Sequence, residues 1–276
     1  MKPRPFDYVR PDSMDEAVAL LAEYGDEGRV LAGGQSLLAM LNLRLADPAA
    51  LIDITRIAAL DEISDLGGKI EIGAAVTQNR LLAWPPLAEK LPLLAAALPL
   101  VGHFQTRNKG TVCGSIAHAD PSSEIPLSLA VLNGEVVLHS IRGERVLPAE
   151  EFQKDLLTTA CQADELITAV RFPVMPGRGV AIREIARRHG DFAIVAVAAM
   201  AEGSGAVRLG VAGASAKPVV RQIASGKYPS AARDAVHALA SELEGYEDLH
   251  ASAAMRRDLL RRLGPLVIEE ALRCAA

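Results

Sequence analysis

The chain has 276 residues, of which 50% are hydrophobic and 23% charged, so its composition is that of a folded, soluble protein of about two domains. The formal net charge of −5 argues against a protein that binds nucleic acid through its phosphates, which takes concentrated lysine and arginine. Three scattered cysteines are too few for a disulfide framework or an iron–sulfur cluster, and no apolar run reaches the roughly 18–20 residues of a membrane span. The N-terminus lacks the apolar core of a signal peptide, so we expect a cytoplasmic protein without a metal site of its own.

The first 57 residues predict alternating helices and strands. Ser13 and Glu16 form a capping box, and the helix that follows ends at Gly25. The apolar pattern then predicts a strand, a helix and a second strand over residues 30–32, 36–45 and 51–54.

A second unit extends to about residue 173. Its hydrophobic pattern predicts strands over 69–73, 136–139 and 166–172 and helices over 77–83 and 86–98. The stretch 102–124 between them is rich in glycine and polar residues and has little periodicity. We predict a long loop there, and a loop of that length inside a domain is usually functional.

Two prolines and two glycines in 172–179 indicate a linker, with a domain boundary near Gly177. Beyond it, three strand-like runs predict an antiparallel meander over 180–188, 193–201 and 206–212. The tail from 230 to 276 is helical in composition, and Gly264-Pro265 is expected to divide it in two.

Two glycine motifs offer backbone amides to an anion. In Leu31-Ala-Gly-Gly-Gln-Ser-Leu37 an apolar strand runs into two glycines, although a plain strand–turn–helix explains that pattern equally well. The segment 105–116 again offers bare amides and hydroxyls around Gly110 and Gly114. Two such loops could hold the two ends of one diphosphate, but spacing alone leaves this open.

Three segments carry a family resemblance: AGGQSLLAMLNLRLADP (32–48), RNKGTVCGSIAHADPSSEIP (107–126) and ARRHGDFA (186–193). In this order and spacing they resemble the FAD-binding medium subunit of molybdenum hydroxylases, relatives of xanthine dehydrogenase and aerobic carbon monoxide dehydrogenase. The resemblance covers the whole chain. It implies an α+β fold with a PCMH-type (vanillyl-alcohol-oxidase-like) FAD-binding domain over 1–176, in subdomains that meet near residue 57. A C-terminal domain over 177–276, with a three-stranded antiparallel sheet and helices, would follow.

The resemblance also implies a set of cofactor-binding residues. Those that would wrap the FAD diphosphate are Leu31, Ala32, Gly33, Gly34, Gln35, Ser36 and Leu37 from one side and Thr111, Gly114 and Ser115 from the other, with Gly102, Thr106 and Gly110 nearby. Glu124 falls where the family places a carboxylate that can accept from sugar-chain hydroxyls. Ile167 would touch the flavin through its backbone.

Two further positions are expected beside the flavin ring. Phe192 falls where relatives set an aromatic or aliphatic side chain against it, and such a residue can gate an electron acceptor. Arg183 lies near the place of a family lysine, where a cation would favour the anionic reduced flavin. Cys113 departs from the family pattern, which usually has glycine there, and we expect it to be a small packed side chain rather than a reactive thiol.

Other tempting residues have simpler interpretations. His118 and Asp120 are expected to hydrogen-bond within their loop and shape the flavin pocket. For 187–189 a phosphate site and a solvated or subunit-facing strand end remain equally open. The arginines of 256–262 predict an amphipathic helix with a basic face.

The sequence therefore leads to a functional hypothesis with two alternatives. As a medium subunit, the chain would take electrons from a small [2Fe–2S] subunit after chemistry at a large molybdopterin subunit, and pass them to an external acceptor. No catalytic residue would be needed in this chain, and the assembly would be a dimer of heterotrimers. The alternatives are a free-standing flavin oxidase or reductase and a nucleotide-binding scaffold without a redox role.

Overall fold

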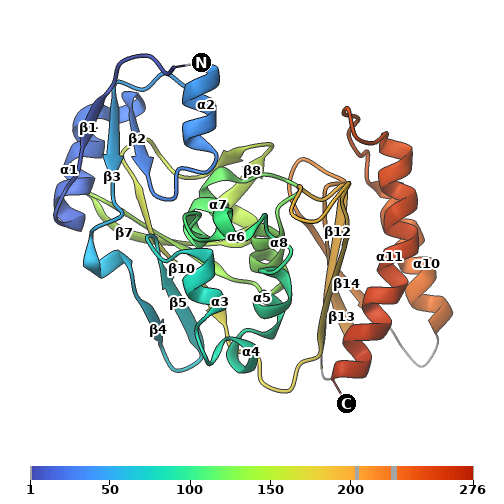
Figure 1. Cartoon of the computed structure of the whole chain (residues 1–276). Coiled ribbons are helices and arrows are strands. Elements are labelled where there is room, and N and C mark those ends of the chain that lie inside the picture. The colour runs from blue at the N-terminus through green and yellow to red at the C-terminus, as the bar shows by residue number, and fades with distance from the viewer. Residues whose placement is uncertain (1, 203–204, 225–228, 276) are drawn as a thin grey trace.

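The computed structural model describes residues 2–202, 205–224 and 229–275. Helices and strands alternate along the chain, and the strands form three main sheets that follow one another in chain order (Figure 1). The expected α+β fold is confirmed. Within the described ranges, no helix has the length and apolar character to cross a lipid bilayer.

The N-terminal sheet is parallel, with strand order β1-β3-β2. Its strands are β1 (Asp7–Val9), β2 (Gly28–Leu31) and β3 (Ala50–Asp53), and its helices are α1 (Met14–Tyr24) and α2 (Leu37–Leu43). The predicted capping box is present in part: the amide of Glu16 donates to Ser13 Oγ at 3.2 Å, but the Glu16 carboxylate accepts from the amide of Asp12 at 2.8 Å instead of from that of Ser13. The first glycine motif follows directly at the end of β2.

The second sheet is antiparallel, with strand order β4-β5-β10-β6-β7. These strands are β4 (Ile63–Asp65), β5 (Lys69–Gly73), β6 (Glu135–Ser140), β7 (Gly143–Pro148) and β10 (Leu166–Pro173), and a separate hairpin consists of β8 (Gln153–Asp155) and β9 (Thr158–Thr159). The three predicted strands of this unit are confirmed as β5, β6 and β10. Helix α1 packs against both sheets and joins their cores.

Short helices connect the strands of this second sheet. They are α3 (Gln78–Leu82), α4 (Leu87–Lys90), α5 (Pro92–Ala97), α6 (Phe104–Arg107), α7 (Val112–His118), α8 (Glu124–Val131) and α9 (Ala149–Phe152). The single helix predicted over 86–98 is two helices, because Leu91 precedes Pro92 and leaves the helical conformation (φ −133°, ψ 61°).

The prediction of a long loop over 102–124 is wrong, since α6 and α7 lie within it. Helix α7 is too short to be stable by itself and depends on tertiary packing. Val112, Cys113 and Ile116 are buried, and the helix packs against β5 and β10. At its start the Thr111 hydroxyl accepts from the amide of Gly114 at 2.9 Å.

The C-terminal sheet is an antiparallel meander, as predicted, but it has four strands instead of three. They are β11 (Val180–Ile185), β12 (Val195–Ala201), β13 (Ala206–Ala212) and β14 (Val219–Ala224). The fourth strand lies at the sheet edge and leaves Arg221 and Gln222 exposed. Its short apolar run does not by itself predict a strand. The segment is a strand because its backbone pairs with β13.

Helices α10 (Pro229–Glu242) and α11 (Ala253–Cys274) complete the fold. The predicted break at Gly264-Pro265 is wrong, because α11 continues through Pro265. A Cβ at Gly264 would lie 2.6 Å from Cγ1 of Val236, so glycine is what allows α11 to lie this close to α10. The apolar face of α11, buried on both sides of the proline, holds the helix together there.

This close approach predicts the effect of a larger side chain. Gly264→Val is expected to lower the free energy of unfolding by about 2 kcal/mol, as overpacked cores do. Adding Val236→Ala removes the obstructing methyl groups and should restore much of that loss. Urea unfolding of the two single variants and the double variant measures the coupling. Equal stability of Gly264→Val and the wild type would contradict the packing.

The basic face predicted over 256–262 is only partly correct. Arg256 is 1% exposed, and its Nη1 donates to the carbonyls of Ile194 (2.6 Å) and Gly213 (2.8 Å). Its Nη2 donates to Asp248 at 2.7 Å, and the guanidinium lies 4.1 Å from the centroid of the Tyr246 ring. Arg256 therefore links α11 by hydrogen bonds to the start of β12 and the end of β13.

The four-stranded sheet separates two layers of helices. Helices α10 and α11 cover one face, and α5 and α8 lie against the other (Figure 1). The central strand β12 is buried on both faces: Val195 and Val197 belong to the core under α10 and α11, whereas Ala196 and Ala198 belong to the core of the rest of the chain. The linker near Gly177 lies between β10 and β11, which belong to different sheets.

Candidate functional site

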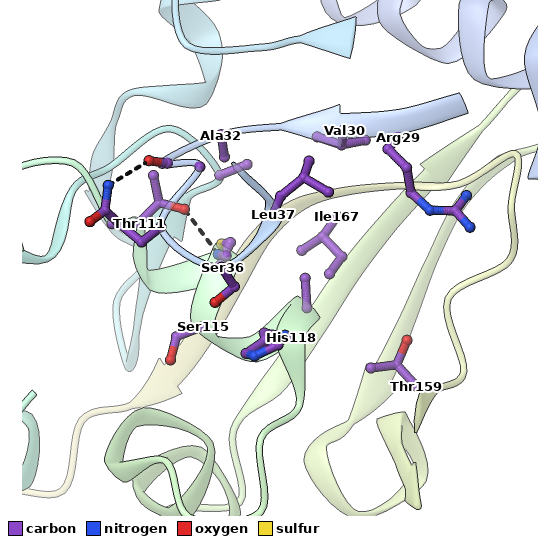
Figure 2. A pocket seen from close by; sticks show the side chains of 18 of the residues that line it. Arg29, Val30, Ala32, Ser36, Leu37, Thr111, Ser115, His118, Thr159 and Ile167 are labelled. Carbon is purple, nitrogen blue, oxygen red and sulfur yellow. Dashed lines mark hydrogen bonds between the residues drawn. The ribbon is translucent and has the colours of Figure 1, made fainter. Parts of the chain in front are cut away.

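A cavity of about 820 Å³ lies where the three parts of the chain meet. Its walls come from the loop between β2 and α2, from α7 and the residues before it, from the segment between β9 and β10, and from the loop between β11 and β12. Figure 2 shows residues of the first three walls pointing toward one another. The volume is in the range of sites for large organic ligands, roughly 300–1,000 Å³.

The two glycine motifs touch at this cavity. A Cβ at Gly33 would overlap the carbonyl oxygen of Lys109 and lie 2.6 Å from Cα of Gly110, so no larger residue fits between the loops. Gly34 has a φ of +69°, which glycine adopts without strain. The amide of Gln78 donates to the carbonyl of Gly110 at 2.8 Å and fixes the second loop from behind.

The first loop presents free backbone donors. Among the described residues, the amide N–H groups of 33–37 donate no hydrogen bond. A run of successive amides of this kind attracts a phosphate or another anion. The Ser36 and Ser115 side chains lie close by in the same cavity (Figure 2). The loop therefore has the donors that a diphosphate needs.

Cys113 is a packed side chain, as predicted. Its thiol is buried and donates to the carbonyl of Ile72 at 3.4 Å, and burial raises its pKa above the ordinary range. The residue keeps a negative φ, so the missing family glycine requires no unusual backbone. A protonated, inaccessible thiol is a poor nucleophile.

All but two of the predicted cofactor-binding residues line this one cavity. Those that do are Ala32, Gly33, Gly34, Gln35, Ser36, Leu37, Gly102, Thr106, Gly110, Thr111, Gly114, Ser115, Glu124, Ile167 and Phe192. They come from segments up to about 160 positions apart in the chain, and the fold brings them together. Their contacts with FAD remain a prediction.

Leu31 and Arg183 are not brought to the cavity. Leu31 lies at the end of β2, and its side chain packs beneath the loop near Gly34. Arg183 points to the other face of β11, where its Nε donates to Glu270 Oε2 of α11 at 2.8 Å. The expected cation beside the flavin is therefore wrong for Arg183.

Two buried carboxyl groups meet beside the cavity, and of the two only Glu124 lines it. Glu124, the first residue of α8, is 2% exposed; burial and then the neighbouring Glu184 and Asp120 raise its pKa to about 8. Glu184, on β11, has its pKa raised to about 7 by burial. The interaction between the two carboxyl groups raises the pKa of Glu124 and lowers that of Glu184.

The remaining predicted neighbours of the cavity have separate roles. Phe192 is 58% exposed in the β11–β12 loop, so one side of its ring faces solvent. His118 ends α7 and lines the cavity (Figure 2). Asp120 accepts from the amide of Ser122 at 2.8 Å, which confirms its expected bonding within the loop.

Sequence reasoning missed lining residues on two sides of the cavity. Arg29 and Val30 precede the first motif on β2, and Thr159 faces them across the cavity (Figure 2). On the Thr159 side of the cavity, Glu165 accepts from Arg145 Nε at 2.6 Å and Nη2 at 2.7 Å, and this ion pair fixes the position of the segment between β9 and β10. Proximity to the first motif could have indicated Arg29 and Val30, but no local pattern marks the residues after β9.

Comparisons with known proteins identify the family of the chain. Residues 4–175 match the family described as FAD binding domain in molybdopterin dehydrogenase. The 6-hydroxypseudooxynicotine dehydrogenase complex subunit alpha of Paenarthrobacter nicotinovorans is 41% identical over 195 residues, which are 70% of this chain and 66% of that protein, just under two thirds of its length. The nicotine 6-hydroxylase medium subunit of the same organism is 35% identical over 274 residues, 96% of each chain.

A solved structure extends the likeness to the whole fold. It is that of carbon monoxide dehydrogenase from Hydrogenophaga pseudoflava lacking the Mo-pyranopterin moiety of the molybdenum cofactor, and one of its chains matches with a TM-score of 0.95. The identity is 32%, and the match covers 100% of both chains. The resemblance inferred from the glycine motifs is thus confirmed, and the chain belongs to the family of FAD-binding medium subunits of molybdenum hydroxylases.

Proposed function

We propose that this chain is the flavoprotein subunit of a three-component molybdenum hydroxylase in the cytoplasm. A small [2Fe–2S] subunit and a large molybdopterin subunit are its partners, in a dimer of heterotrimers. The observation that carries the proposal is the pair of glycine loops in contact at Gly33, where residues whose amides donate no hydrogen bond line one cavity. Bound FAD supplies the capacity to accept electrons singly and release them singly or in pairs.

The residues of the chain bind and orient the cofactor in this proposal. The amides of 33–37 and the hydroxyls of Ser36 and Ser115 hold the diphosphate, and the contact between the loops keeps these donors in place. Ile167, at the start of β10, meets the ring through its backbone, and Phe192 stands at the mouth. We further propose that residues 1–176 and 177–276 are the two domains, with the cavity between them.

Phe192 gives a test of access to the flavin. With its ring half in solvent at the cavity mouth, Phe192→Ala should let molecular oxygen reach the reduced flavin and speed its reoxidation severalfold, measured per bound flavin. Phe104→Ala is the matched control, because Phe104 is also 58% exposed but lies outside the cavity lining. Equal reoxidation rates in the wild type and both variants would contradict the gate.

The electron route is tested on the complex purified with the products of neighbouring genes. Carbon monoxide, nicotine, caffeine and glyceraldehyde, the compounds in the names of relatives, are the first substrates to try. The proposal predicts that a substrate of the complex bleaches the flavin only when all three subunits are present. Bleaching by the chain alone would support a free-standing oxidase, and a colourless complex would support a scaffold.

A further inference from the structure

Glu124 and Glu184 meet across two parts of the chain. Glu124 begins α8 and lines the cavity, whereas Glu184 extends from β11. Alternate residues of β11 face opposite sides of the sheet, and Val180 and Ile182 pack on the same core as α8. Glu184 therefore points toward Glu124 and away from the Arg183–Glu270 ion pair.

The pair lacks a cation. Within the described part of the chain, neither carboxyl group belongs to an ion pair, and Glu184 Oε2 is buried without a hydrogen-bond partner. The charges that act on Glu124 are Glu184 and Asp120, both negative. Two carboxylates in such surroundings repel each other, and one retained proton removes the repulsion and supplies the missing donor.

Other elements packed against the pair bring no compensating charge. Helix α5 and strand β12 have no titratable side chain. Helix α7 contributes His118, which lines the cavity and forms no ion pair with either glutamate among the described residues. Arg208 of β13 donates to the carbonyls of Val131 and Ala130, at the opposite end of α8 from Glu124. The charged side chains of the other neighbours are paired, exposed or on the other face of the sheet: Arg221 of β14, Glu150 and Glu151 of α9, Arg183 of β11, and those of α11.

We propose that Glu124 and Glu184 share one proton, and that FAD binds tightly only while the pair holds it, so that FAD binding at alkaline pH takes up a proton. The inference rests on the proposed placement of FAD in this cavity. A diphosphate on the glycine loops adds negative charge beside Glu124, so the neutral group is favoured when the cofactor is present. Glu124 would then touch the cofactor region, and Glu184 would act through it as a positioning residue.

The direction of the pH dependence follows from the raised pKa values of both groups. Below about pH 7 the pair already holds its proton, and FAD affinity is independent of pH. As the pH rises above about 8 the free protein loses the proton, and the dissociation constant should increase up to about tenfold per pH unit. The same groups lower folding stability as the pH rises from the value for an unfolded glutamate, about 4.3, toward 8.

The test measures FAD binding to the full-length chain stripped of flavin, from about pH 6 to about pH 9. Calorimetry in two buffers of different ionisation enthalpy counts the protons taken up. Glu184→Gln should move the rise of the dissociation constant to lower pH, because it removes one of the negative charges that raise the pKa of Glu124, and Glu184→Asp should keep the wild-type profile. Glu144→Gln, which removes an exposed carboxylate on β7, is the matched control and should behave like the wild type.

The outcomes separate this inference from the proposed function. A pH-independent dissociation constant and no proton uptake in the wild type would overturn the inference while leaving FAD binding in place. A pH dependence unchanged in Glu184→Gln would also overturn it. Absence of FAD binding even at pH 6 would overturn the proposed function and this inference together. Because the calorimetry uses the wild type, the result stands even if a variant fails to fold.

Discussion

Replacing Gly33 with alanine is expected to reduce FAD affinity about a hundredfold. The new Cβ would overlap the Lys109 carbonyl oxygen and crowd Cα of Gly110, and neither backbone group can rotate aside. The two loops would have to separate, and the amides of 33–37 would leave their positions. Losing two hydrogen bonds to a charged diphosphate costs about 3 kcal/mol, which corresponds to this factor.

Titration of the stripped chain with FAD at pH 6.5 measures this effect, and circular dichroism checks that the fold persists. Gly67→Ala is the control: Gly67 lies in a turn and, unlike Gly33, has a positive φ, so alanine is strained there, but its Cβ would meet no atom within 4 Å. The Gly67→Ala variant shows the effect of an alanine in a turn where the new Cβ contacts no other part of the protein. FAD affinity in Gly33→Ala equal to that of Gly67→Ala would show that contact between the loops is irrelevant to the cofactor.

Replacing Arg256 with methionine is expected to lower the free energy of unfolding by about 2–6 kcal/mol, because two buried carbonyl groups each lose a donor at a cost of about 1–3 kcal/mol. Methionine preserves much of the side-chain volume but leaves the carbonyls of Ile194 and Gly213 without their donor. Asp248 loses its ion pair as well, and the cation over the Tyr246 ring disappears.

Chemical denaturation of the wild type and of Arg256→Met measures the loss of unfolding free energy. Arg262→Met is the matched control, since Arg262 lies on the same helix and pairs with Asp258 on the exposed surface, where such a pair contributes at most about 1 kcal/mol. If both substitutions changed stability by the same amount, the buried network around Arg256 would have no special role.

The first glycine motif could be predicted from the sequence because its signals are local. A strand, two glycines and a helix follow one another within a few residues, and the residues that indicate each of them are neighbours in the chain. Its partner loop could be recognised as a motif, yet its secondary structure could not. Helix α7 exists because β5 and β10 cover its apolar side, and that contact joins segments distant in sequence.

The error at Arg183 has a simple geometric origin. Side chains alternate between the faces of a strand, so a shift of one residue moves a side chain to the opposite side. Glu184 faces Glu124 near the cavity, and Arg183 faces α11. No pattern within a single strand reveals which face will meet the cofactor domain.

Arg256 and Pro265 show the same limit in a helix. A run of arginines between leucines predicts a solvated face, and a proline after a glycine predicts an end. Arg256 is buried because its guanidinium donates to the carbonyls of Ile194 and Gly213, next to the ends of two strands. Helix α11 continues beyond Pro265 because it packs against the sheet and against Val236. Long-range contacts thus decide where local preferences are overridden.

We propose that this chain carries FAD between its two glycine loops as a subunit of a larger complex. The most direct measurement is the FAD content per chain of the complex purified with its partners, for the wild type and for Gly33→Ala. We predict one FAD per chain in the wild type, and a Gly33→Ala complex that keeps its iron and molybdenum but has lost nearly all its FAD. A wild-type complex without FAD, or a Gly33→Ala complex with full FAD, would contradict the claim.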